Sequence, residues 1–164
     1  MQKEEQFNAL RQRNERTIRQ VCWSFFPRDA YNYKSLYAGI LLRLWEQMDK
    51  VGYVESESAW VHQLALRYAI NEYRREKNQP QLLEITETMA DTLPEIRSDE
   101  SRQQLEELMT ALKPQDKSIL NLYLSGYTSQ EMAQMLDRRK GAIEVQIHRI
   151  KQKLIKIQSQ IDNR

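Results

Sequence analysis

The chain has 164 residues, of which 40% are hydrophobic and 29% are charged, and its net charge at pH 7 is +2. This balance is typical of a soluble protein with one ordinary domain or two small ones, and it excludes a largely disordered chain. No apolar run approaches the roughly 20 residues that span a bilayer, and the single Cys22 can form no internal disulfide.

The scarcity of helix-breaking residues predicts an all-α fold. Gly and Pro number four each, and the long stretches between them are rich in good helix formers. The polar start is unlike a signal peptide, so we expect a cytoplasmic protein in which Cys22 is a buried structural thiol. Basic residues outnumber acidic ones in 1–78 and 137–164 but not between them, so any electrostatic contact with nucleic acid is expected there.

Two amphipathic helices are predicted first. Apolar residues three or four positions apart predict a helix from about Phe7 to Phe25, which Pro27 ends, and a second helix from about Ala30 to Met48. The expected apolar positions of the second helix are Leu36, Ile40, Leu41, Leu44 and Trp45.

A third helix is expected after a loop over residues 49–58. Ser56 or Ser58 can cap this helix, and Asn78 with Pro80 supplies its stop. Its apolar face includes Trp60, Val61, Leu64, Ala65, Tyr68 and Ala69, and its last turn carries Arg74, Arg75 and Lys77. His62 is expected at the surface or half-buried on this helix.

Residues 79–98 interrupt the pattern. They are acidic, contain Pro80 and Pro94, and have only weak periodicity. We interpret them as a flexible linker between two helical domains, residues 1–78 and 99–164, with a short helix around Leu83 to Met89.

Two helices are predicted at the start of the second domain. Ser98 or Asp99 can cap the first, which holds Leu105, Leu108, Met109 and Leu112. Pro114 begins the next helix, and Gly126 ends it in the position where left-handed backbone is easiest. The side chains expected to face inward there are Ile119, Leu120 and Tyr123.

A helix-turn-helix is predicted from Thr128 onward. Thr128 and Glu131 form the pattern of a capping box, a short helix follows to about Leu136, and a long helix runs from about Arg139 to Ser159. The small Ala133 permits close approach of the two helices, and an apolar hub is expected to join them. The expected hub residues are Met132, Leu136, Ile143 and Ile147.

The outward face of this motif has the chemistry of a DNA reader. Gln and Arg side chains can read base edges in a major groove, while Lys and Arg hold phosphates. The candidates are Arg138, Arg139, Lys140, Glu144, Gln146, His148 and Arg149. The alternative is a helical hairpin that packs against another protein with a solvated basic face, and His148 could equally cover the hub.

These residues resemble region four of the bacterial sigma factors of the extracytoplasmic-function group, in the sigma-70 family. The similar stretches are Leu112-Lys113-Pro114, residues 119–128, Glu131-Met132-Ala133, Leu136, Gly141-Ala142-Ile143 and Ile147-His148-Arg149. In that family this region is a helical bundle whose helix-turn-helix reads the −35 element of a promoter. The resemblance implies that role for the seven candidates named above.

The first domain resembles region two of the same family. Residues 41–46 are similar to the helix that grips the polymerase clamp, and residues 60–75 are similar to the helix that engages and melts the −10 element. The resemblance implies contacts with core polymerase by Leu36, Ile40, Leu41, Arg43, Leu44 and Trp45. It implies −10 contacts by Tyr53, Trp60, Arg67, Tyr68, Asn71, Arg74 and Arg75.

Aromatic and cationic side chains suit the second role, because they stack on unpaired bases and neutralise phosphates. The loop with Tyr53 is a candidate for holding a flipped base. Two simpler interpretations remain open: Trp60 as a core residue, and Arg74 with Arg75 as an ordinary charge pair at a helix end.

The chain departs from the family pattern at several positions. Residues 32–39 lack the acidic pair and the glutamine that usually precede the clamp-binding run. Arg67 and Asn71 stand where the family tends to have Asn and Asp, and Glu144 and Gln146 occupy positions that are often basic. These differences suggest a divergent member that reads an unusual promoter or depends on a recruiting protein.

The sequence therefore predicts a sigma factor that binds the clamp and flap of RNA polymerase core and promoter DNA. An anti-sigma factor or another recruiting protein is a further expected partner. The alternatives are a stand-alone helix-turn-helix regulator and an interaction protein that has lost DNA contacts. We expect no enzymatic activity, cofactor or metal, because His62 and His148 lie in different domains and no Gly-rich phosphate loop occurs.

Overall fold

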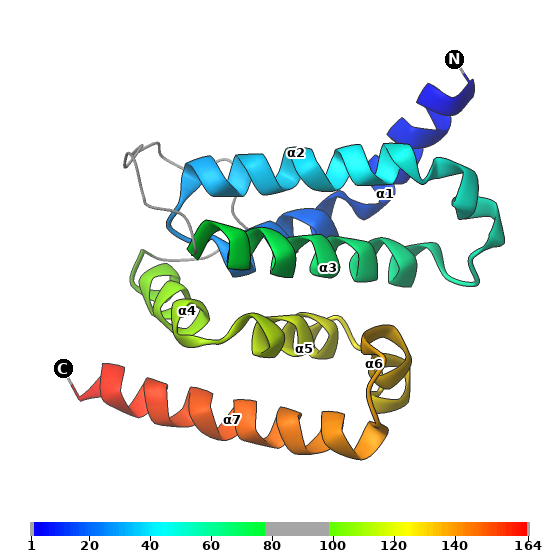
Figure 1. Ribbon diagram of the computed structural model, residues 1–164. Helices are drawn as coiled ribbons and strands as arrows, with labels where there is room; N and C mark the ends of the chain where they lie inside the picture. The colour runs from blue at the N-terminus through cyan, green and yellow to red at the C-terminus, as the bar shows by residue number, and fades with distance from the viewer. Residues whose placement is uncertain (1, 78–98, 164) are drawn as a thin grey trace. The chain divides into compact units, whose positions relative to one another are not determined.

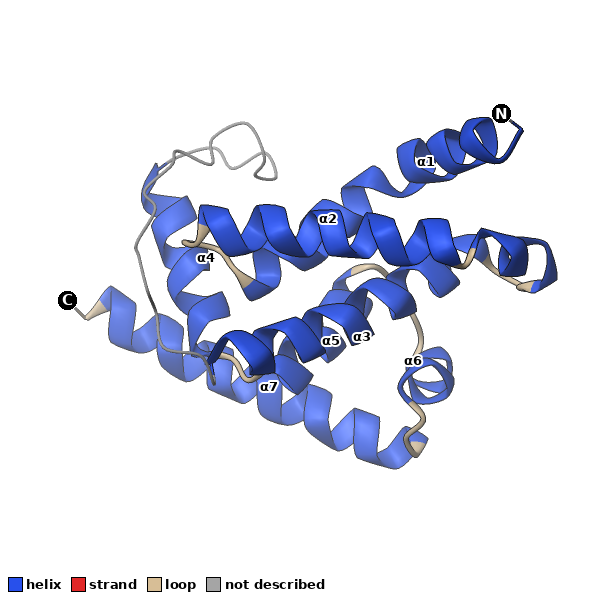
Figure 2. Ribbon diagram, turned by 45° about the horizontal axis from the view of Figure 1, so that its top comes forward, coloured by secondary structure: helices blue, strands red, loops and turns tan. Residues whose placement is uncertain are grey.

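The computed structural model describes residues 2–77 and 99–163, with the side chains of 102–163 in the second range. The chain divides into two compact units, Met1–Pro94 and Glu95–Arg164. The described residues form helices and connecting turns and include no strand (Figure 2). The expected all-α fold of two helical domains is confirmed. The expected linker, the short helix within it, the Asn78–Pro80 stop and the Ser98 cap lie outside the described residues.

Residues 2–77 of the N-terminal unit form a bundle of three long helices. These are α1 (Gln2–Phe25), α2 (Ala30–Glu46) and α3 (Glu57–Lys77), and a 3-10 helix, η1 (Met48–Tyr53), joins the last two (Figure 1). Asp29 caps α2, since its side chain accepts a hydrogen bond from the Asn32 backbone N–H at 3.0 Å. Each long helix packs against the other two.

The core of this unit consists of apolar side chains at helical spacing. Buried residues recur three or four positions apart along much of each helix, as expected for apolar stripes that face a shared core. The buried residues include Leu10, Ile18, Val21, Leu36, Ile40, Leu44, Val61, Ala65, Leu66 and Ala69. Cys22 is fully buried, as expected, and burial raises the pKa of its thiol to about 12.

The structure differs from the sequence prediction in the end of the second helix, in the loop after it and in the burial of His62, and it selects Ser56 over Ser58 as the cap of α3. The second helix ends at Glu46 and not near Met48, and the first half of the expected loop is the 3-10 helix η1. Ser56 is the residue that caps α3, because its hydroxyl accepts from the Ala59 backbone N–H at 3.3 Å. His62 is buried and not at the surface. Burial lowers the pKa of its imidazole to about 4.

The described part of the C-terminal unit, residues 99–163, contains four helices. They are α4 (Asp99–Ala111), α5 (Pro114–Leu124), α6 (Ser129–Leu136) and α7 (Lys140–Asp162), and α7 packs against the other three. The core residues include Met109, Leu112, Ile119, Leu122, Met132, Ile143 and Ile150.

The inward faces of α4 and α5 differ from the prediction. Tyr123 and Leu105 are 40% and 36% exposed, whereas Leu122 is fully buried. The physical reason is the register of α5: its buried face runs through Ser118, Ile119 and Leu122, so the next residue turns outward. The expected hub is only partly buried, with Leu136 and Ile147 half-exposed and Ile150 buried in addition.

Candidate nucleic-acid interface

The helix α6, a short turn and the helix α7 form the predicted helix-turn-helix. The Thr128 hydroxyl accepts from the Glu131 backbone N–H at 3.1 Å, and the Glu131 carboxylate accepts from the Thr128 backbone N–H at 3.0 Å. The capping box is thus confirmed. The turn itself depends on Asp137, which has left-handed backbone with φ of 53°. Asp tolerates this conformation better than most residues, but the sequence prediction did not identify it.

Five of the seven −35 candidates lie on the surface of this motif. Arg139, Lys140, Glu144, His148 and Arg149 are all exposed, within the first three turns of α7 or immediately before it. His148 therefore does not cover the hub. Lys140 and Glu144 form an exposed ion pair at 3.9 Å, which contributes little to stability and leaves both groups available.

The other two candidates, Arg138 and Gln146, are half-buried and hydrogen-bond to each other. The Arg138 guanidinium donates to the Gln146 amide oxygen at 2.5 Å, and the Gln146 amide nitrogen donates to Asp116 of α5 at 3.1 Å. The expectation that Gln146 points outward to read a base is therefore wrong for this structure, because its amide is engaged within the protein.

In the N-terminal unit, six of the −10 candidates lie along one stripe of α3. Trp60, Arg67, Tyr68, Asn71, Arg74 and Arg75 follow each other at spacings that place them on one side of a helix. Trp60 and Tyr68 are half-buried, and the other four are exposed. Trp60 is thus not a full core residue. Arg75 forms an ion pair with Glu72 at 3.8 Å. This contact is compatible with the simpler interpretation of Arg74 and Arg75 as ordinary charges at a helix end.

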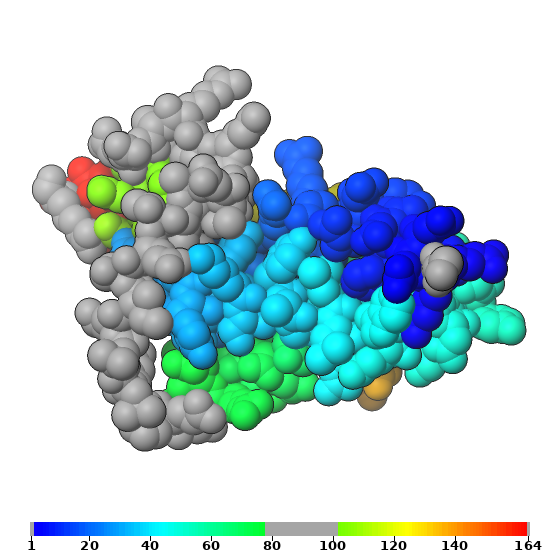
Figure 3. All heavy atoms as spheres, turned by 90° about the horizontal axis from the view of Figure 1, so that it is seen from above, coloured from blue at the N-terminus to red at the C-terminus, as the bar shows by residue number. Residues whose placement is uncertain are grey.

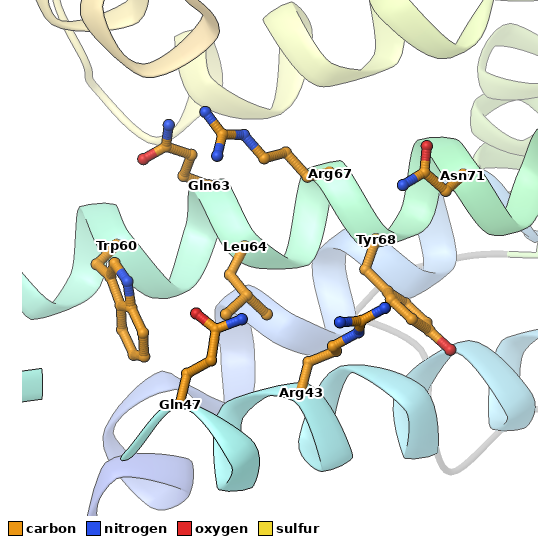
Figure 4. Close-up of a pocket in the computed structure, with 8 residues that line it drawn as sticks. All are labelled: Arg43, Gln47, Trp60, Gln63, Leu64, Arg67, Tyr68 and Asn71. Atoms are coloured by element: carbon orange, nitrogen blue, oxygen red, sulfur yellow. The ribbon is translucent and has the colours of Figure 1, made fainter. Parts of the chain in front are cut away.

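A groove runs beside this stripe. Eight residues of α3 and of the end of α2 line it: Arg43, Gln47, Trp60, Gln63, Leu64, Arg67, Tyr68 and Asn71. Figure 4 shows Trp60, Leu64 and Tyr68 on the side of α3 that faces α2, with Arg43 and Gln47 rising toward them. Two aromatic rings, two guanidinium groups and three amides therefore share one surface, which is a chemistry suited to unpaired nucleotides.

Arg43 belongs to this groove. Its guanidinium lies over the Tyr68 ring, 5.7 Å from the ring centroid. The sequence prediction assigned Arg43 to polymerase and did not identify Gln47 or Gln63. A signal existed for the last of these, because Gln63 precedes Arg67 by one helical turn and so shares its face.

Tyr53 stands apart from the stripe, at the end of η1. Its side chain is 91% exposed, so it is available for stacking. The start of α3 beside it is tied to α1 by Arg13, which donates to both carboxylate oxygens of Glu57 at 3.0 and 2.6 Å. This pairing lowers the pKa of the Glu57 carboxyl below its usual value.

The residues assigned to polymerase contact divide into two groups. Leu36, Ile40 and Leu44 are fully buried in the bundle core, so the expectation that they touch a partner is wrong for this structure. Leu41 and Trp45 are half-buried at the end of α2. The Trp45 ring meets Phe7 edge-on at 5.4 Å between centroids, and Lys3 lies 4.2 Å from its centroid. Figure 3 shows the first turns of α1 against this end of α2.

Among the described residues, no group of three or more His, Cys, Asp or Glu side chains is placed to hold a metal ion. None of the helices in the same ranges is long and apolar enough to cross a membrane.

Comparison with known proteins gave a family match within the C-terminal unit. Residues 102–154 match the family model described as sigma-70, region 4. The matched residues, called the region 4 domain below, lie within the C-terminal unit. The match includes most of α4, all of α5 and α6, and the part of α7 that carries Lys140 and Arg149.

Two solved structures share the fold of the whole chain. One is CnrH in complex with the cytosolic domain of CnrY, with a TM-score of 0.68 and 16% identity over 95% of this chain and 89% of that one. The other is the sigma factor RpoE from Bartonella quintana in complex with the anti-sigma factor NepR, with a TM-score of 0.70 and 14% identity over 92% and 97%.

A comparison with curated proteins gave no match. The match over residues 102–154 agrees with the predicted resemblance to the sigma-70 family, and the two solved structures show that the fold is shared.

Proposed function

We propose that the protein is a sigma factor that binds RNA polymerase core and directs it to promoters. The region 4 domain carries this proposal, because it presents a capped helix-turn-helix with exposed cations on its second helix. A helix of this kind fits a major groove, where the cations neutralise phosphates. Arg139, Lys140, Glu144, His148 and Arg149 are the proposed −35 contacts.

The stripe of α3 is the proposed −10 surface. Melting a promoter requires a surface that holds unstacked bases, and the aromatic residues Trp60 and Tyr68 line the groove together with Arg43 and Arg67. Tyr53 is proposed to hold a flipped base, since its ring is almost fully exposed. Asn71, Arg74 and Arg75 extend the same stripe and are proposed to bind phosphates.

The end of α2 is the proposed contact with the polymerase clamp. Leu41 and Trp45 are half-buried there, and Leu42 beside them is 58% exposed, so apolar surface is accessible to a partner at this end of the helix. The two similar structures are complexes of sigma factors or their structural relatives with a second protein. We propose that an anti-sigma or recruiting protein likewise regulates this chain.

The first test is co-purification of the tagged full-length protein with core polymerase that lacks its usual sigma factor. Transcription from a library of genomic fragments follows. We expect stoichiometric binding and new, discrete start sites. Binding without discrete start sites would indicate a missing recruiting protein. Failure to bind core would refute the proposal and favour a stand-alone helix-turn-helix regulator.

Matched variants separate the two surfaces of the N-terminal unit. Trp45→Ala is expected to weaken core binding, whereas Trp60→Ala is expected to leave core binding intact and to impair promoter opening. Tyr31→Ala is the control, because Tyr31 is a 60% exposed aromatic residue on α2 outside both surfaces. Equal effects of all three substitutions on core binding would contradict the division.

A further inference from the structure

Four polar side chains form a network that joins α5, the turn before α7, and α7. Besides the two hydrogen bonds through Gln146, the Lys153 ammonium donates to the second Asp116 oxygen at 3.3 Å. We call Asp116, Arg138, Gln146 and Lys153 the Asp116 network. Its members lie 30 and 37 residues apart across α5 and α7, so it fixes how these two helices pack.

Charge determines the orientation of the Gln146 amide. An ionised Asp only accepts hydrogen bonds and an Arg only donates them, so the amide nitrogen must face Asp116 and the amide oxygen must face Arg138. A glutamine that reads adenine needs both ends of its amide for the base. Gln146 has each end committed to a charged neighbour and is therefore unsuited to that task.

Asp116 is the anchor of the network. Its side chain is only 13% exposed and receives hydrogen bonds from Gln146 and from Lys153, which lie about two turns apart on α7. It also lies in the first turn of α5, where a negative charge is favoured by the helix dipole. The Asp116 carboxylate thus fixes the position of the Gln146 amide.

Arg138 is the outer end of the network. Its guanidinium has five donor hydrogens in a rigid plane, and the bond to Gln146 leaves others available. It precedes Arg139 and Lys140, which are exposed beside it. A side chain held in one orientation loses less entropy when it binds a phosphate than a freely moving one.

We propose that Asp116 and Gln146 are positioning residues, which hold Arg138 for contact with a DNA phosphate while the exposed residues of α7 read the sequence. This inference rests on the proposed function of the region 4 domain. It assigns Gln146 an indirect role, although Gln146 lies on the helix that enters the DNA.

The test compares three variants of the full-length protein with a matched control. Gln146→Met removes both hydrogen bonds at nearly constant length, Asp116→Ala removes the anchor, and Arg138→Ala removes the phosphate contact. Gln152→Met makes the same chemical change as the first at an exposed position of α7 outside the network. Binding to a fixed DNA duplex is measured at several salt concentrations, and binding to randomised duplexes is measured together with core polymerase.

We expect Gln146→Met and Arg138→Ala to weaken binding to all duplexes, and to reduce the slope of log affinity against log salt by about one. The double variant Gln146→Met/Arg138→Ala should bind no more weakly than Arg138→Ala alone, because both substitutions remove the same contact of Arg138 with a phosphate. Asp116→Ala should reproduce part of this loss, and Gln152→Met should change nothing.

Two results would overturn the inference. If Gln146→Met relaxes the preference at a single base pair, Gln146 reads that base. If the substitution lowers the melting temperature but leaves the salt slope unchanged, the network is only structural. The fixed duplex tests the network without polymerase, so its outcome is separate from a failure of core binding, which would instead refute the sigma factor proposal.

Discussion

Gly39 lies in the middle of α2, where the ring of Tyr68 rests directly on its backbone. A Cβ atom added at Gly39 would overlap with the outer atoms of this ring. In a helix interior, replacing Gly by Ala normally stabilises by up to about 1 kcal/mol, whereas forcing a side chain out of its packing costs about 1–3 kcal/mol. The absence of a side chain at Gly39 therefore sets the position of Tyr68 in the groove.

This close approach predicts opposite effects of one substitution in two backgrounds. Gly39→Ala is expected to lower the free energy of unfolding in the native sequence, because Tyr68 must move. In a Tyr68→Ala background the same change should raise it by up to about 1 kcal/mol, because only helix propensity remains. Urea unfolding of the four proteins measures both values, and the same sign in both backgrounds would contradict the packing.

His62 predicts a pH dependence of stability. Its pKa is lowered by burial from about 6.5 to about 4, so the unfolded chain binds a proton more readily than the folded one between these values. The resulting stability is present above pH 6.5 and is lost as the pH falls toward 4, by up to about 3 kcal/mol. Unfolding followed from pH 7 to pH 4.5 measures this loss.

The matched comparison uses the two histidines of the chain. His62→Gln is expected to remove most of the loss between pH 6.5 and 4.5, whereas His148→Gln, at an exposed position, is expected to retain it. Because the first variant is itself destabilised, its slope against pH and not its absolute stability is the informative quantity. An unchanged slope in His62→Gln would assign the pH dependence to other groups.

At the scale of elements, the sequence predicted the helices well because their apolar residues recur with the helical period. The register of α5 was less predictable: Ile119, Leu120, Leu122 and Tyr123 are all apolar or aromatic, so several faces fit the pattern. Tertiary packing selected the face with Leu122. The hydrogen bond from Gln146 to Asp116 could not be predicted from the sequence for a similar reason. It joins residues 30 positions apart, which only the packing of two helices brings together.

The helix α6 gives the element-scale prediction. A helix of only eight residues is marginally stable without further support. The capping box of α6 supplies such support, because it satisfies backbone donors in the first turn. Thr128→Ala is expected to lower the free energy of unfolding by about 1 kcal/mol. Gln130→Ala, at an exposed position of the same helix, is expected to have little effect or to stabilise slightly.

Circular dichroism during urea unfolding measures both variants, and promoter binding of Thr128→Ala with core polymerase provides a functional readout. The cap contacts no proposed DNA residue, so its loss should weaken −35 binding only through the position of α6 against α7. Equal stability of the two variants would mean that the capping hydrogen bonds are replaced by water at no cost.

At the scale of the whole molecule, the chain has a separate buried core in each compact unit. Ile40 is fully buried in the N-terminal unit and Ile143 in the C-terminal unit. Truncating a buried isoleucine to alanine costs about 2–5 kcal/mol, because it removes apolar contact and leaves a cavity. Substitutions in separate cores with no shared neighbours are expected to act independently.

Hydrogen exchange followed by mass spectrometry tests this independence along the chain. Ile40→Ala is expected to reduce protection of peptides from residues 2–77 alone, and Ile143→Ala that of peptides from residues 99–163 alone, because local stability follows the core that each peptide helps to form. Loss of protection in both ranges from either substitution would mean that the units unfold cooperatively. Independent units would explain how one chain can hold the two proposed DNA surfaces, whose chemistry differs, because stacking on unpaired bases and reading a duplex then place demands on different cores.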